Sequence, residues 1–189
     1  FTKLGYPLTG PACRRKFQGQ SMTTVCEEIS TQIDQKLQPE AIQQEINYAL
    51  KSGIKAIAGV ENLVSRLIKN GIDLCVASSG TIEKMHTTLG QTSLLPHLKQ
   101  VLFSSSQVAR GKPHPDVFLF AAEKMGYNPE HCIVIEDSLS GVQSGIAAGM
   151  KVLGYCGDDF TSKEVLGDAG AEIITSMDEV LPFIERSNK

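Results

Sequence analysis

The chain has 189 residues, a formal net charge of −3 and a sequence pI near 5.8. Because basic residues are not in excess, nucleic acid and anionic membrane surfaces are not favoured as partners. No apolar run approaches the roughly 20 residues needed to cross a bilayer, and the first residues lack the apolar stretch of a signal peptide. The length suits one sizeable core, or a core with a small accessory domain.

The five cysteines are odd in number and scattered, without a Cys-x-x-Cys pair. Cys75 and Cys132 lie inside apolar runs, where a free thiol behaves as a small hydrophobic group. This usage is typical of a reduced, cytoplasmic protein. The four histidines have no metal-ligand spacing, so a zinc site is not expected.

Residues 1–57 carry a helical pattern of apolar residues. Two sets of apolar side chains recur at helical spacing, and Pro39 suits the first position of the second helix. Gly53 follows as a predicted helix stop. We therefore predict a small helical domain whose first helix is incomplete at its N-terminus. The two sets are Met22, Val25, Cys26, Ile29 and Ile33, and then Ile42, Ile46, Ala49 and Leu50.

From residue 58 onward, short apolar strands alternate with helices. Strands are expected at residues 72–77, 101–103, 133–135, 152–154 and 172–174. Helices are expected near residues 60–71, 81–89, 115–125 and 140–148, and a capping box at residues 176–179 precedes the last one. This alternation predicts βαβ units. The fold class is therefore α/β, with residues 58–189 forming a Rossmann-like, doubly wound parallel sheet.

Three polar loops follow predicted strands, at the carboxyl ends where parallel sheets bind ligands. The first is Ser78-Ser79-Gly80, whose hydroxyl and backbone N–H groups suit phosphate oxygens, although Ser and Gly are also common helix caps. The second carries Lys112 between Gly111 and Pro113; a lysine can meet phosphate as a point charge, but most lysines are solvated. Arg110 and His114 beside it are expected to be exposed loop residues.

The third loop is Glu136-Asp137-Ser138, after an almost wholly apolar strand. Two adjacent carboxylates repel each other unless a cation compensates them, and Mg2+ prefers one or two carboxylates completed by water and phosphate. The alternative is that Asp137 or Ser138 only caps the next helix. That helix contains Gly141 and Gly145, which indicate close backbone approach to a neighbour, and packing alone explains them.

In this order the loops resemble the haloacid dehalogenase-like hydrolase superfamily, in the subgroup of β-phosphoglucomutase and sugar-phosphate phosphatases. The resemblance is strongest at residues 111–116, 136–138 and 145–150. It implies that Ser78, Ser79, Gly80 and Lys112 bind the transferring phosphoryl group, with Ser78 and Lys112 catalytic, and that Asp137 and Glu136 hold Mg2+. It also implies that residues 1–57 form a cap whose loop, with Lys16, Gln18, Gly19 and Gln20, faces the substrate.

The chain departs from this family at the first motif, an Asp-x-Asp that carries the nucleophile at the end of the first strand. No Asp-x-Asp occurs in the sequence. We therefore expect the core to lack that strand, which leaves two strand edges unpaired, and the chain as given to lack turnover. A second departure is Met22, at the position where β-phosphoglucomutases carry an arginine for the phosphate that is not transferred.

These observations predict that the complete protein is a Mg2+-dependent phosphatase of small sugar phosphates, acting through an aspartyl-phosphate. Residues 78–85 resemble bacterial 6-phosphogluconate phosphatases. The alternatives are a β-phosphoglucomutase-like phosphomutase and a non-catalytic protein that binds phosphorylated ligands. A small phosphorylated metabolite is the expected partner, and a monomer is expected.

Overall fold

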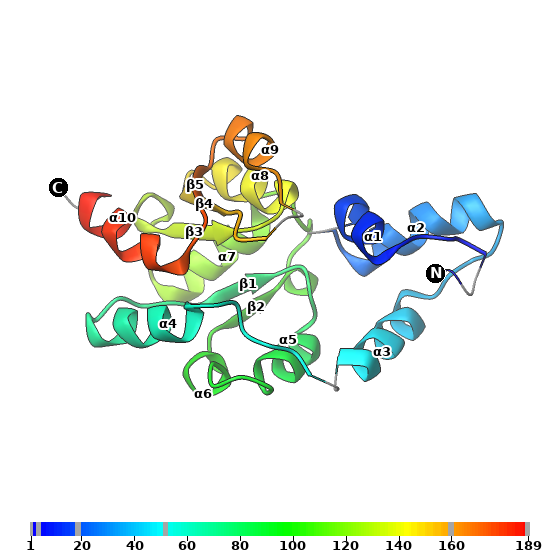
Figure 1. Ribbon diagram of the computed structural model, residues 1–189, viewed down its shortest axis with the longest axis horizontal. Helices are drawn as coiled ribbons and strands as arrows, with labels where there is room; N and C mark the ends of the chain where they lie inside the picture. Colours follow the sequence, from blue (N-terminus) through cyan, green and yellow to red (C-terminus); the bar gives the residue numbers. More distant parts are fainter. Residues whose placement is uncertain (1, 3–4, 18–19, 51–52, 159–160, 188–189) are drawn as a thin grey trace.

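The computed structural model describes residues 2, 5–17, 20–50, 53–158 and 161–187. Figure 1 shows three helices grouped at one end of the molecule and the remaining elements packed around short strands at the other. The three helices are α1 (Gly10–Phe17), α2 (Met22–Ile33) and α3 (Pro39–Leu50). The helices beyond them are α4 (Val60–Lys69), α5 (Ile82–Leu89), α6 (Leu95–Leu98), α7 (Asp116–Met125), α8 (Leu139–Ala147), α9 (Lys163–Asp168) and α10 (Val180–Ser187).

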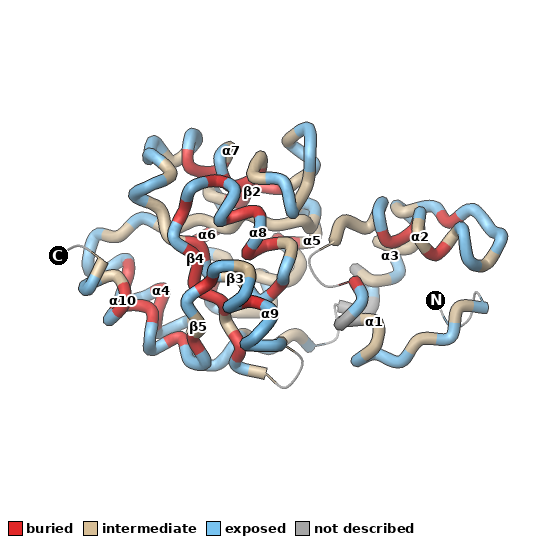
Figure 2. The backbone as a smooth tube through the Cα atoms, turned by 90° about the horizontal axis from the view of Figure 1, so that it is seen from above, coloured by how far each residue is buried: buried red, intermediate tan, exposed pale blue. Residues whose placement is uncertain are grey.

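The helices α1–α3, which we call the helical unit, have an apolar cluster of their own. Val25, Cys26 and Ile29 repeat along one face of α2 and are all buried, as their helical spacing predicts. Phe17 and Leu37 complete this cluster from the flanking segments. The side chain of Ser21 caps α2 by accepting from the Thr24 backbone N–H at 3.2 Å. Figure 2 shows this buried stretch apart from the larger buried region around the strands.

The strands are β1 (Val76–Ser78), β2 (Leu102–Ser104), β3 (Ile133–Glu136), β4 (Lys151–Tyr155) and β5 (Glu172–Ile174). Every pairing is parallel, which confirms the predicted α/β class. The described strands form two sheets, β1-β2 and β3-β4-β5. Backbone pairing does not join β1 to β3 within the described residues.

Helices pack closely on the sheets and fix the strand ends. The α8 helix lies against β3 and β4, and a Cβ at Gly145 would come within 2.7 Å of Val152 Cγ2. Close backbone approach is therefore the reason for this glycine, as the sequence predicts. Leu63 and Leu67 of α4 pack with Leu153 of β4 and with α10 in a second cluster.

Several boundaries differ from the sequence-based expectations. The first strand is confined to residues 76–78 rather than 72–77, because its partner β2 has three residues to pair with. The short helices α6 and α9 were not predicted, and each is under two turns long. The capping box is confirmed: Ser176 and Glu179 bond reciprocally in a 3-10 turn before α10. Among the described helices, none has the length and apolar character required for a membrane span.

Candidate active site

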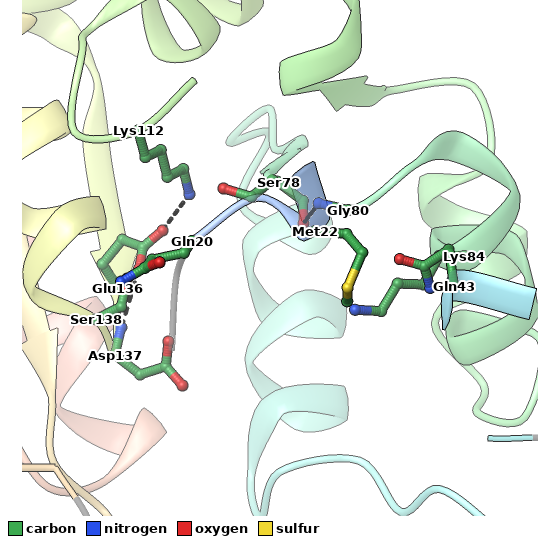
Figure 3. Close-up of a pocket in the computed structure, with 11 residues that line it drawn as sticks. Gln20, Met22, Gln43, Ser78, Gly80, Lys84, Lys112, Glu136, Asp137 and Ser138 are labelled. Carbon is green, nitrogen blue, oxygen red and sulfur yellow. Dashed lines mark hydrogen bonds and ion pairs between the residues drawn. The ribbon is translucent and has the colours of Figure 1, made fainter. Parts of the chain in front are cut away.

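The three polar loops converge in one pocket, where the carboxyl ends of β1 and β3 face the helical unit (Figure 3). The pocket is lined by Gln20, Met22, Gln43, Ser78, Ser79, Gly80, Lys84, Lys112, Glu136, Asp137 and Ser138. The structure thus brings together Ser78, Ser79, Gly80, Lys112, Glu136 and Asp137, which the sequence places in three separate segments.

Lys112 bridges the two sheets. Its side chain is 4% exposed, and its ammonium donates to Glu136 Oε1 at the tip of β3 and to the Ala77 carbonyl of β1 at 3.1 Å. The ammonium also lies 4.5 Å from the centre of the Phe118 ring. The solvated-lysine alternative is therefore wrong for this residue. A lysine ammonium that is buried and held in place by such contacts is suited to bind an anion at the strand tips.

Glu136 is fixed by its neighbours. Oε2 accepts from the Asp137 backbone N–H at 3.2 Å and from Ser138 Oγ at 2.9 Å, while Oε1 accepts from Lys112. A Cβ on Gly141 would overlap the Glu136 carboxyl group. Gly141, to which the sequence analysis assigned packing alone, therefore leaves the space that this carboxylate occupies. Ser138 also caps α8 by accepting from the Gly141 N–H at 3.1 Å.

The loop Ser78-Ser79-Gly80 is shaped by a buried serine on the next strand. Gly80 donates its N–H to Ser78 Oγ at 3.0 Å, and Ser104 Oγ donates to the Gly80 carbonyl at 2.8 Å. Thr81, rather than Ser78 or Ser79, caps α5, so the helix-cap alternative does not account for the two serines. The start of α5 adds the positive end of a helix dipole beside this loop.

A metal would meet Asp137 at the edge of the pocket. Asp137 is exposed and Glu136 is largely taken by Lys112, Asp137 N–H and Ser138. No group of three His, Cys, Asp or Glu side chains suited to a metal ion occurs in the described part of the chain. Since Mg2+ is commonly held by one or two carboxylates with water and substrate phosphate, the two acids fit part of a magnesium site. Their metal role stays a prediction.

The helical unit contributes one of the expected loop residues to the pocket. Gln20 lines it, and its buried Oε1 has no hydrogen-bond partner among the described residues. Lys16 is not in the lining; its ammonium lies 2.7 Å from both Glu28 Oε1 and Tyr6 Oη. Gln18 and Gly19 lie outside the described residues. The substrate roles of all four stay predictions.

The residues that flank Lys112 hold its loop in place and do not lie at the tip of the pocket. Arg110 and Asp116 form an ion pair at 2.9 Å, and hydrogen bonding to Arg110 lowers the pKa of the Asp116 carboxyl group. The fully buried Ser144 donates to the His114 carbonyl at 2.7 Å and so ties the loop to α8. Arg110 and His114 line the larger groove that continues from the pocket.

Ser104 and Ser144 were missed by the sequence analysis, because each supports the site through one hydroxyl bonded to a backbone carbonyl distant in sequence. A serine inside an apolar strand, as at position 104, is the one sign that could have pointed to such a bond.

The fold and the site define an α/β protein whose strand tips gather a lysine, hydroxyls and two acids. The profile of the haloacid dehalogenase-like hydrolase family matches residues 1–155. The chain therefore belongs to this family of hydrolases.

Named phosphatases are among its relatives. The chain is 31% identical over 162 residues to 6-phosphogluconate phosphatase of Escherichia coli K12, covering 84% of this chain and 72% of that protein. It is 38% identical over 104 residues to hexitol phosphatase A of the same organism, covering 53% and 46%. A family hydrolase from Deinococcus radiodurans, solved with bound phosphate and sodium, aligns at a TM-score of 0.75 and 28% identity over 99% of this chain and 85% of its own.

Proposed function

We propose that this chain is the larger part of a Mg2+-dependent phosphatase that acts on small sugar phosphates. The observation that carries this proposal is the buried Lys112 ammonium, held beside Ser78 and Gly80 where three strand-tip loops meet. A transferring phosphoryl group would lie between Lys112 and this loop, since both present donors to its oxygens. The phosphatase relatives support the same reaction class.

Asp137, with Glu136, would hold Mg2+ at the open side of the pocket. When bound, this cation would neutralise phosphoryl oxygens next to Lys112. In this arrangement Glu136 orients the Lys112 ammonium and Asp137 offers the more exposed carboxylate.

The pocket lining offers no carboxylate nucleophile of its own. Its two acids are Glu136 and Asp137, which the proposal assigns to Lys112 and to the metal. We propose that an aspartate carried by a further parallel strand, between the open edges of β1 and β3, would form the aspartyl-phosphate. Such covalent catalysis divides one difficult displacement into two easier steps. By itself the chain would bind phosphate without turning it over.

The helical unit would act as a cap over this pocket, with residues 1–57 as one domain and residues 58–189 as the other. Gln20, Met22 and Gln43 reach the pocket from the cap. Met22 presents no charge to a second phosphate, which favours phosphatase chemistry over phosphomutase chemistry.

Calorimetric titration of the chain with inorganic phosphate in MgCl2 tests the phosphate site. We expect Lys112→Met to weaken phosphate binding by at least about tenfold, because a charge-assisted bond is lost. Lys124→Met, an exposed lysine on α7, is the matched control and should bind as the wild type does. Equal affinity of all three proteins would contradict the proposal.

A second experiment separates the two enzyme classes in a longer protein that includes this chain and the further strand. Release of phosphate from hexose monophosphates is expected. Interconversion of β-glucose 1-phosphate and glucose 6-phosphate without net release would instead establish a phosphomutase. Phosphate binding without either reaction would point to a binding protein.

A further inference from the structure

Lys84 is a second lysine in the pocket, and the proposed reaction does not use it. It lies on the first turn of α5, directly after the phosphate-binding loop. Its methylene chain packs over Gly80, where an added Cβ would come within 3.3 Å of Lys84 Cδ. The absence of a side chain at Gly80 therefore lets Lys84 lie against the loop, which directs its ammonium into the pocket.

The Lys84 ammonium has no ion-pair partner among the described residues. Within the described ranges, no carboxylate lies within the 4.0 Å ion-pair distance and no hydrogen bond is made by this ammonium. Lys112, by contrast, is paired with Glu136. Lys84 is half-buried, and this burial lowers its pKa. A partly desolvated cation without a partner is unfavourable on its own, and a ligand anion would relieve that cost.

The position of Lys84 separates it from the phosphate contacts. Figure 3 shows its side chain reaching toward Met22 and Gln43 of the helical unit, whereas Lys112 and Glu136 lie on the other side of Ser78. The contact between α3 and α5 brings Gln43 and Lys84 to the same end of the pocket. A ligand whose phosphate meets Lys112 would thus present its remote end to Lys84.

We propose that Lys84 is a specificity-determining residue that binds a carboxylate at the end of the substrate remote from its phosphate. The substrate class would then be phosphorylated sugar acids rather than neutral sugar phosphates, an inference that rests on the proposed phosphate site. A single ammonium matches a monoanion, whereas a second phosphate calls for more donors. Two exposed acids in the adjoining groove, Glu40 and Glu83, further disfavour a dianion there.

Calorimetry with three probes tests this inference: 6-phosphogluconate, glucitol 6-phosphate and glucose 1,6-bisphosphate, each in MgCl2. We expect the wild-type chain to bind 6-phosphogluconate about tenfold more tightly than glucitol 6-phosphate, the worth of one charge-assisted contact. Lys84→Met should remove this preference, because it lowers the affinity for 6-phosphogluconate by much more than the affinity for glucitol 6-phosphate. Lys84→Arg should restore part of the preference, and Lys124→Met should keep all of it. Far-UV circular dichroism checks that each variant is folded, and Lys84→Gln takes the place of Lys84→Met if that variant is not.

The outcomes separate the inference from the proposed function. Equal binding of 6-phosphogluconate and glucitol 6-phosphate by the wild type would overturn the role of Lys84 but leave the phosphate site in place. Tightest binding of the bisphosphate, lost in Lys84→Met, would overturn the carboxylate in favour of a second phosphate. Failure of every probe, inorganic phosphate included, would overturn the proposed function and this inference with it.

Discussion

The Glu136 carboxyl group occupies the space above the backbone of Gly141, where any Cβ would overlap it. Glu136 in turn holds the Lys112 ammonium. The position of the proposed phosphate-binding lysine therefore depends on a glycine in the first turn of α8.

Gly141→Ala should displace Glu136 and release Lys112 from its position. We expect phosphate affinity to fall about tenfold, the effect of losing one charge-assisted bond, as measured by calorimetry. Gly167→Ala is the matched control, because its Cβ would meet only Ile173 at an ordinary 3.8 Å. Phosphate affinity unaffected by Gly141→Ala would show that Glu136 does not position Lys112.

Lys112→Met should also destabilise the fold, because Glu136 is only 11% exposed and would be left as a carboxylate without its cation. Removing one partner of a buried ion pair costs about 3 kcal/mol or more. The double variant Lys112→Met with Glu136→Gln should be more stable than Lys112→Met alone, since the uncompensated charge is gone. Urea unfolding of the wild type, Lys112→Met, Glu136→Gln and the double variant measures this coupling. Additive effects of the two substitutions would argue against it.

Ser104→Ala should lower the free energy of unfolding by about 1–3 kcal/mol, because the part-buried Gly80 carbonyl loses its donor. Ser105→Ala is a close control: its hydroxyl is buried without a partner among the described residues, so its removal should cost little. Denaturant unfolding compares the two variants. Equal destabilisation would mean that the bond from Ser104 to Gly80 is not the cause.

The free energy of unfolding should fall at alkaline pH because of the Cys75 thiol. Burial raises the pKa of its thiol from 9.0 to about 11. Above pH 9 the unfolded chain releases this proton while the folded chain keeps it, so the free energy of unfolding falls as pH rises from 9 to 11. The loss should approach about 2 kcal/mol. Cys75→Ala should remove this part of the pH dependence in urea unfolding at pH 8.5 and 10.5, and an unchanged slope would contradict the assignment.

The order of the main helices and strands could be predicted from the sequence, because apolar periodicity and turn residues are local properties. The helices α2, α3 and α7 and the strands β3 and β4 follow from that pattern. The length of β1 could not be predicted, because it depends on how many residues β2 offers for pairing. The short helices α6 and α9 are too brief to show a period.

The sequence predicted those parts of the candidate site that lie at the carboxyl ends of strands. Parallel strands place their carboxyl ends together, so Ser78, Lys112 and Glu136 were expected to meet. The pairing of Lys112 with Glu136, the space above Gly141 and the supports Ser104 and Ser144 depend on tertiary packing. Sequence spacing carries no information on such contacts between distant elements.

The purified chain should not release phosphate from p-nitrophenyl phosphate, even in excess Mg2+. Ser78 Oγ accepts from the Gly80 N–H, and the described pocket lining includes no histidine that could activate it as a base. Asp137→Asn serves as the control. Turnover by the wild type that disappears in this variant would show that the chain carries its own nucleophile.

The central claim is that phosphate binds between Lys112 and the Ser78–Gly80 loop, and a crystal structure of the chain grown with phosphate and MgCl2 tests it most directly. We predict phosphate oxygens within hydrogen-bonding distance of Lys112 Nζ and of the loop's hydroxyl or N–H donors. Phosphate bound instead at Arg110 and His114 in the outer groove, with Lys112 still closed on Glu136, would contradict the account.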